Sequence, residues 1–143
     1  MLAIPMISLS QGIVEKDGYY YQDGQLYSGT FYEYFDNGTI KSEFLIVDGL
    51  KDGLSFIYFE NGTKKEQWSF KAGKKDGTWL TWDENKTLTA EANFKDGLKH
   101  GSWYVWDSNG IKRYEIFYEN GKKSGNWLMW DEQGNLAESK NYD

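Results

Sequence analysis

Glycine recurs at one fixed spacing along this chain, and that spacing constrains the fold more than any other feature. Three series of glycines repeat at 24 residues or, once, at twice that interval. They are Gly29, Gly53, Gly77, Gly101 and Gly125; Gly38, Gly62, Gly110 and Gly134; and Gly49, Gly73, Gly97 and Gly121. Three registers with a single period indicate a tandem repeat that covers nearly everything after residue 28.

Each unit of the repeat contains two β-prone runs separated by turn signals. The unit that begins at Gly77 reads GTWLTWDENKTLTAEANFKDGLKH. Its first run carries Trp79 and Trp82, and its second run ends at Phe94 before Asp96-Gly97. Asn-Gly and Asp-Gly between such runs are strong hairpin signals because Asn, Asp and Gly tolerate positive φ. Each unit is therefore predicted to be a β-hairpin, with the second and third glycine series in its turns.

Stacked hairpins predict an all-β fold. Tandem antiparallel hairpins would form one elongated, twisted or curved meander sheet. Almost no helix is expected, because no stretch combines an apolar period of 3.6 residues with helix caps. The repeat domain is predicted over residues 18–143, with a degenerate first unit at 18–28 and 24-residue units starting at 29, 53, 77, 101 and 125.

Two details of the repeat predict local structure. Trp79 and Trp82 are three residues apart, so in a regular strand they point to opposite faces of the sheet. Either both faces carry aromatic rows, or a bulge turns one ring. Lys86 stands in the empty slot of the second glycine series, so we expect a non-glycine residue at positive φ there, at a cost of about 1 kcal/mol.

Residues 1–17 precede the repeat and allow two interpretations. The apolar stretch MLAIPMISLSQ ends in the small-x-small pattern Ser8-Leu9-Ser10 but has no basic start. It is either a signal-peptide remnant or an N-terminal arm that covers the first hairpin. The localisation is correspondingly either exported or cytoplasmic.

Charge and composition exclude several classes of function. The chain has 143 residues, a formal net charge of −6 and no Cys. Nucleic-acid binding needs a concentrated basic surface and is excluded. The lack of cysteine excludes disulfides and thiolate metal sites.

The titratable residues form no catalytic constellation. Most carboxylates recur at repeat positions and are therefore expected to serve the repeat itself. The single histidine, His100, replaces Asp52 and Asp76 in a polar link and is interpreted as a solvated turn residue. No catalytic residue, metal ligand or cofactor is predicted, and the protein is not expected to be an enzyme.

The aromatic rows and the turn edges are the candidate interaction surfaces. If the hairpins stack in register, the Asn-Gly turns form an acidic edge and the Asp-Gly turns a mildly basic one. This difference either maintains solubility or steers a partner with a basic face. Lys74, Lys75, Lys122 and Lys123 offer only a weak patch for anionic lipid. Aromatic residues serve either packing or binding, and the predicted partner contacts are Tyr32, Phe56, Trp82, Tyr104, Trp106 and Trp130.

The recurring pattern G-x-W-x-x-W-D-E-N-G-x-x-K-x-E-x-x-F-x-D-G-K-K-D-G resembles the MORN-repeat variant of bacterial YwqK-like antitoxin proteins. It is clearest at residues 77–100 and 101–120. The resemblance implies stacked hairpins and a binding role. We therefore expect a non-catalytic protein-interaction module of antitoxin or immunity type, whose partner would be a toxin protein. The alternative is a structural or envelope- and membrane-associated repeat scaffold.

Overall fold

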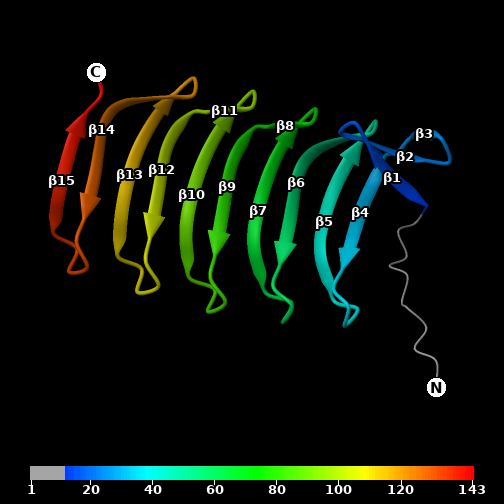
Figure 1. Ribbon diagram of the computed structural model, residues 1–143, viewed down its shortest axis with the longest axis horizontal. Coiled ribbons are helices and arrows are strands. Elements are labelled where there is room, and N and C mark those ends of the chain that lie inside the picture. The colour runs from blue at the N-terminus through cyan, green and yellow to red at the C-terminus, as the bar shows by residue number, and fades with distance from the viewer. Residues whose placement is uncertain (1–11) are drawn as a thin grey trace.

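The computed structural model describes residues 12–143, which form one long antiparallel sheet and one small sheet (Figure 1). Successive strands of the long sheet are neighbours, so the chain is a meander of hairpins. No helix occurs in the part of the chain that the structure describes, and the predicted all-β fold class is confirmed. The strands are β4 (Gly29–Tyr34), β5 (Ile40–Val47), β6 (Leu50–Tyr58), β7 (Lys64–Lys71), β8 (Lys74–Lys75), β9 (Gly77–Trp82), β10 (Leu88–Lys95), β11 (Leu98–Lys99), β12 (Gly101–Trp106), β13 (Lys112–Glu119), β14 (Lys122–Trp130) and β15 (Leu136–Asn141).

Both kinds of turn use positive φ. The eight glycines of the second and third series lie in turns with φ between 78° and 86°. In the Asp-Gly turns the preceding residue also has positive φ, 48° at Asp48, which is the geometry of a two-residue hairpin turn of type I′. Lys86 occupies its glycine slot with φ of 65°, as expected.

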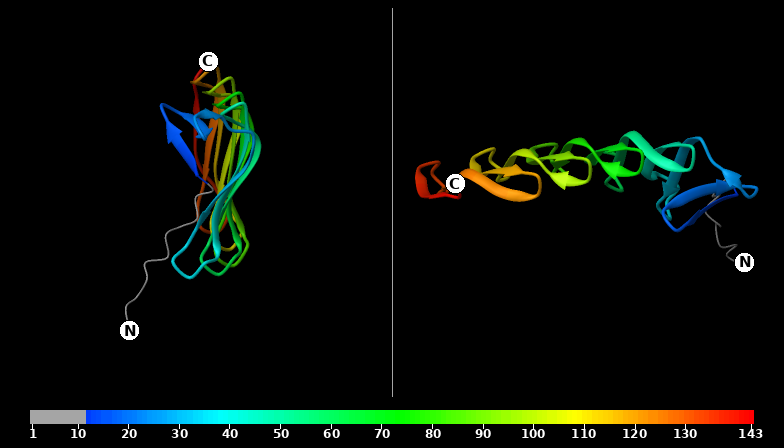
Figure 2. Two further views of the ribbon diagram at one scale, coloured as in Figure 1. Left: turned by 90° about the vertical axis from the view of Figure 1, so that its right-hand side faces the viewer. Right: turned by 90° about the horizontal axis from the view of Figure 1, so that it is seen from above.

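Four glycines of the first series lie in bulges, namely Gly53, Gly77, Gly101 and Gly125. Residues 68–69 of β7 face residues 76–79 on the next strand, so the second side carries two extra residues. Gly77 lies in this bulge with φ of 92°. Trp79 closes it, because the indole Nε1–H donates to the backbone carbonyl of Ser69 at 3.0 Å. Bulges increase local twist, and the long sheet is visibly twisted in Figure 2.

Where the repeat is irregular, a small residue on one strand faces a large residue on the next strand. Ser55 stands where the later units have tryptophan, and it pairs with Phe44 on one side and Trp68 on the other. The Phe44 and Trp68 ring centroids are 6.0 Å apart, and Ser55 is fully buried. In the next hairpin the order is reversed, because Trp79 pairs with Ala92. A large residue thus meets a small one in both hairpins.

A second sheet lies against one face of the long sheet at its N-terminal end (Figure 2). It consists of β1 (Ile13–Lys16), β2 (Tyr19–Gln22) and β3 (Gln25–Leu26). Residues 13–26, expected to divide between an arm and a degenerate unit, therefore share one small sheet. The choice between a signal-peptide remnant and an arm falls on residues 1–11, which lie outside the described part of the chain.

The most buried apolar residues lie where the two sheets meet. Ile13 and Tyr20 of the small sheet pack with Phe44 and Ile46 of the long one, and each of the four is less than a tenth exposed. Farther along, the long sheet is a single layer (Figure 2). Its side chains there are mostly half-buried rather than enclosed.

Candidate functional site

The two faces of the long sheet carry different side chains. Directly paired residues point to the same face and successive residues to opposite faces. We call the face against which β1–β3 pack face A; it includes Phe44 and Trp79. Face B is the opposite face and includes Tyr104 and Trp82. Trp79 and Trp82 thus lie on opposite faces, and both faces carry aromatic rows.

Face B holds every predicted partner contact. All six are half-buried, and within residues 12–143 no second layer encloses them. Tyr104 contacts Trp106 with a centroid separation of 5.5 Å, and Lys112 Nζ lies 4.6 Å from the Tyr104 centroid and 5.5 Å from that of Trp130. The six residues are Tyr32, Phe56, Trp82, Tyr104, Trp106 and Trp130.

Carboxylates alternate with these rings on face B. Glu43 pairs with both Tyr32 and Phe56, and Glu115 pairs with both Tyr104 and Leu128. Burial raises the pKa of the Tyr58 hydroxyl, and the charge and hydrogen bond of Glu43 raise it further. Face B therefore offers aromatic surface with carboxylates set between the rings, and one of them, Glu115, is paired with Lys112 at 3.0 Å.

Face A carries a continuous row of contacting rings. Each ring centroid lies 5.1–6.5 Å from the next. The row is Tyr20, Phe31, Phe44, Trp68, Trp79, Phe94, Trp103 and Tyr118. Lysines spaced one unit apart cover it: the Nζ atoms of Lys51, Lys75 and Lys99 lie 4.1, 4.3 and 4.4 Å from the centroids of Phe44, Trp79 and Trp103. Such cation–π contacts stabilise partly desolvated lysines.

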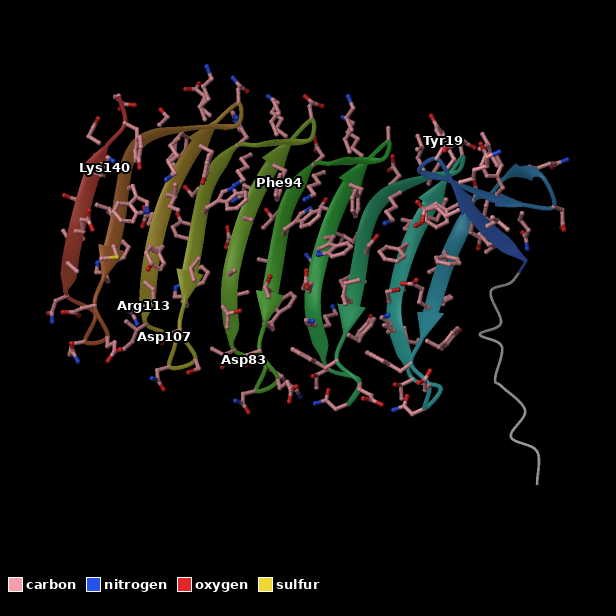
Figure 3. The ribbon with its side chains drawn as sticks, viewed as in Figure 1. Tyr19, Asp83, Phe94, Asp107, Arg113 and Lys140 are labelled. Carbon is pink, nitrogen blue, oxygen red and sulfur yellow. The ribbon has the colours of Figure 1, made fainter. Side chains whose placement is uncertain are left out.

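Carboxylates at the Asn-Gly edge serve the turns. Asp83 and Asp107 lie at this edge (Figure 3). Asp107 Oδ1 accepts hydrogen bonds from the backbone N–H groups of Asn109 and Ile111 at 2.9 and 3.0 Å. Its Oδ2 lies 3.7 Å from the Arg113 guanidinium. These carboxylates stabilise turns, and they also make the edge acidic.

The Asp-Gly edge links one unit to the next. The Gly73 N–H donates to the Lys51 carbonyl at 2.8 Å, and the other three turns make the same bond. The side chain of Asp76 adds a second bond by accepting from the Asp96 N–H at 3.1 Å. His100 takes the place of Asp76 one unit later. It is not the solvated residue expected, because Nδ1 is buried and has no partner in the described chain.

The described residues hold no site for a metal ion. Within residues 12–143, no three His, Cys, Asp or Glu side chains are grouped closely enough to bind one. No helix there is long and apolar enough to cross a membrane. A shallow hollow beside His100 is lined by Asp76, Glu91 and Asp96.

One candidate surface was missed by the sequence reasoning. It lies on face A of the last two units, and we call it the open patch. Val105 and Tyr114 are direct partners there, 40% and 37% exposed. The sequence did contain a signal for it, because side chains alternate between faces along a strand and Val105, two residues after Trp103, shares its face. The open patch comprises Trp103, Val105, Tyr114, Ile116, Trp127 and Met129.

Comparison with known proteins identifies the family to which the repeat belongs. The family profile described as MORN repeat variant matches residues 27–48, 51–72, 75–96 and 99–120, more than half of the chain. No curated protein matches. Twelve chains of solved structures match, including the crystal structure of the GtfA/B complex bound to UDP and GlcNAc. That likeness has 7% identity and a TM-score of 0.31 over 99% of this chain and 25% of the other, and it supports no further conclusion. The profile matches show that the chain belongs to the MORN repeat variant family.

Proposed function

We propose that this protein is a non-catalytic interaction module that holds a protein partner against face B. MORN repeats generally serve as protein- or membrane-interaction modules. The observation that carries the proposal is that face B bears Tyr and Trp side chains along the sheet, and that no second layer formed by the described residues covers them. Half-exposed Tyr and Trp are favoured anchors at protein interfaces.

The partner should present a basic surface with apolar pockets. Glu43, Glu91 and Glu115 alternate with the rings of face B, and the Asn-Gly edge beside them is acidic. Negative charge of this kind raises the rate of encounter with a basic protein and fixes its orientation. Burial of the rings would then supply most of the affinity.

An antitoxin or immunity role is the specific form of this proposal. The partner would be a toxin protein whose working surface is covered by face B. The resemblance to antitoxin-type MORN proteins motivates this form. A toxin gene adjacent to this one in the genome would support it directly.

The test is co-purification from native cells with the wild-type chain and two variants. The wild type is expected to recover one stoichiometric protein partner. The double variant Tyr104→Ala/Trp106→Ala should reduce its recovery about 100-fold, since each ring contributes roughly tenfold or more. Val14→Ser is the control, because Val14 lies on β1, outside face B and the open patch, and is 61% exposed. No partner, or equal recovery by the double variant, would refute the proposal.

A membrane-associated scaffold is the second candidate, favoured by the lysines of the Asp-Gly edge. Lys71, Lys74 and Lys75 flank one turn and Lys122 and Lys123 another, near the tryptophans of face A. Flotation with vesicles containing anionic lipid discriminates the two functions. Binding to anionic but not to neutral vesicles would support the scaffold, and absence of flotation would exclude it.

A further inference from the structure

The small sheet β1–β3 shows how face A accepts a β segment. The Tyr20 ring centroid lies 5.3 Å from that of Phe31, and the Tyr20 side chain is only 4% exposed. The Tyr20 backbone N–H donates to the carbonyl of Gly49, in an Asp-Gly turn, at 2.8 Å. One aromatic side chain, packed together with Ile13, and one backbone bond from β2 to the turn edge therefore hold the small sheet.

Charge complements the aromatic contact in this docked segment. Lys51 Nζ lies 5.9 Å from the Tyr20 centroid and 4.1 Å from the Phe44 centroid. Burial lowers the pKa of Lys51, and the negative charge of Glu15, on β1, opposes that effect. The segment 12–28 is acidic overall. An acidic segment is thus matched to a lysine that lies over face A.

The same positions in the last two units form the open patch, and nothing in the described chain covers them. Ser42, on face A of the first unit, is 1% exposed, whereas Tyr114 at the same repeat position is 37% exposed. The residues of the open patch are also more apolar than the residues at the same positions in the first two units. Trp103, Val105, Tyr114, Ile116, Trp127 and Met129 replace Phe31, Glu33, Ser42, Phe44, Ser55 and Ile57. Exposed contiguous apolar surface of this kind marks interaction sites.

The rim of the open patch repeats the basic character of the docked site. Lys99 and Lys123 occupy the slot of Lys51. Lys99 Nζ lies 4.4 Å from the Trp103 centroid and 4.9 Å from the Tyr118 centroid. The two lysines are at the same edge as the turn carbonyls, so a segment that enters there meets positive charge and a backbone acceptor together.

We propose that the open patch docks an acidic, extended segment of a partner protein that inserts one aromatic side chain, as β2 inserts Tyr20 within this chain. The surface is continuous with the face that already holds β1–β3. A second copy of this chain would bring its own basic rim, and its acidic segment 12–28 already packs on its own first units. A free acidic segment of a partner neutralises Lys99 and Lys123 instead. The proposal concerns face A and does not depend on the binding proposed for face B.

The test uses the full chain and a synthetic peptide of residues 12–28 as the probe. Within each molecule the chain's own small sheet occupies the first two units, so the added peptide can reach only the later units. In ¹⁵N spectra, the Trp103 and Trp127 indole N–H signals are expected to shift saturably with peptide. A peptide with Tyr20→Ala should bind at least about tenfold more weakly. Replacing Glu15, Asp17 and Asp23 by their amides should also weaken binding, and increasingly so at low salt.

The variant Val105→Glu/Tyr114→Ser tests the patch itself. It introduces the residues that the chain uses in the first unit, Glu33 and Ser42, so the fold is expected to persist. Peptide affinity should fall at least about tenfold. Phe117→Leu is the matched control, since it changes exposed apolar area on face B and Leu45 has the same slot; its peptide affinity should equal that of wild type.

Four outcomes would overturn the proposal. They are the absence of any saturable shift up to about 1 mM peptide, wild-type affinity in the Val105→Glu/Tyr114→Ser variant, shifts confined to face B residues, and shifts that depend on chain concentration without peptide. The last outcome would assign the patch to a second copy instead. None of these results bears on the co-purification test of face B, so the two proposals fail separately.

Discussion

Replacing Lys86 by glycine should stabilise the protein. The Lys86 N–H donates to the Asp83 carbonyl at 3.0 Å, the bond that the glycines make in the other turns, but its φ of 65° is unfavourable for a residue with a Cβ. A Cβ built at Gly38, Gly62 or Gly110 meets no atom within 4 Å, so the penalty in this slot is backbone strain and not a clash.

The size of the effect follows from two opposing terms. Relief of the left-handed conformation contributes about 1–2 kcal/mol, and the extra freedom of glycine in the unfolded chain costs about 0.5–1 kcal/mol. The expected gain is about 0.5–1 kcal/mol, or a rise in Tm of roughly 2–4 °C for a chain of this length. Urea unfolding followed by tryptophan fluorescence measures it directly.

Two further variants separate backbone strain from the lysine side chain. Lys86→Ala removes the ammonium group and retains the Cβ, so it should lack the gain. Gly110→Lys imposes the same strain on a neighbouring unit and should lose a comparable amount. If Lys86→Gly is no more stable than Lys86→Ala, or if Gly110→Lys costs nothing, the reasoning from φ is wrong.

Three other perturbations test local features. His100→Asp should raise the free energy of unfolding, measured in urea, by about 1 kcal/mol. A carboxylate at this position can accept a hydrogen bond from the Asn120 N–H, as Asp52 and Asp76 do from the equivalent N–H groups at earlier links. An unchanged free energy of unfolding would contradict this account of the link. Ser55→Ala should leave stability unchanged or raise it by up to about 1 kcal/mol, because the buried hydroxyl has no hydrogen-bond partner among residues 12–143. A loss above about 1 kcal/mol would reveal such a partner. Burial, aided by Glu15 and Glu33, raises the pKa of Tyr20 to about 12. Its folded pKa thus exceeds its unfolded value of about 10, so up to about 2–3 kcal/mol is present below pH 10 and lost toward pH 12. Tyr20→Phe should remove that part of the decline in denaturation at increasing pH, and an unchanged decline would refute the assignment.

The repeat spacing predicted most of the long sheet because turn chemistry is local. An Asn-Gly or Asp-Gly pair specifies a hairpin with little help from distant residues. The odd separation of Trp79 and Trp82 predicted either aromatic rows on both faces or a bulge that turns one ring, and the structure has the first arrangement. Spacing alone did not distinguish a turn glycine from a bulge glycine. The bulge at Gly77 is bridged by the indole bond from Trp79 to the opposite strand, which is a tertiary contact.

The small sheet was harder to predict for a different reason. Asp23-Gly24 is a turn signal, but it lies off the 24-residue register, and periodicity does not say which surface a segment will cover. Ser55 likewise looked like a weak member of its series. Its role became clear only beside Trp68, which fills the space that a larger residue would need. Both the position of the small sheet and the role of Ser55 depend on residues of other strands, which the pattern along one strand does not reveal.

The pairing of the small residue Ser55 with the large residue Trp68 limits how the gene can gain or lose repeat units. The backbone links between units are alike, so recombination that adds or removes 24 residues preserves the hydrogen-bonded sheet. The side chains of face A are not interchangeable in this way. A deletion that joined Phe44 to Trp79 would put an indole where Ser55 now lies, between Phe44 and its next neighbour, and a duplication of the Ser55 strand would leave space beside Trp68. The order of the units therefore matters as well as their number. It keeps the open patch at one end of the array and the small sheet at the other.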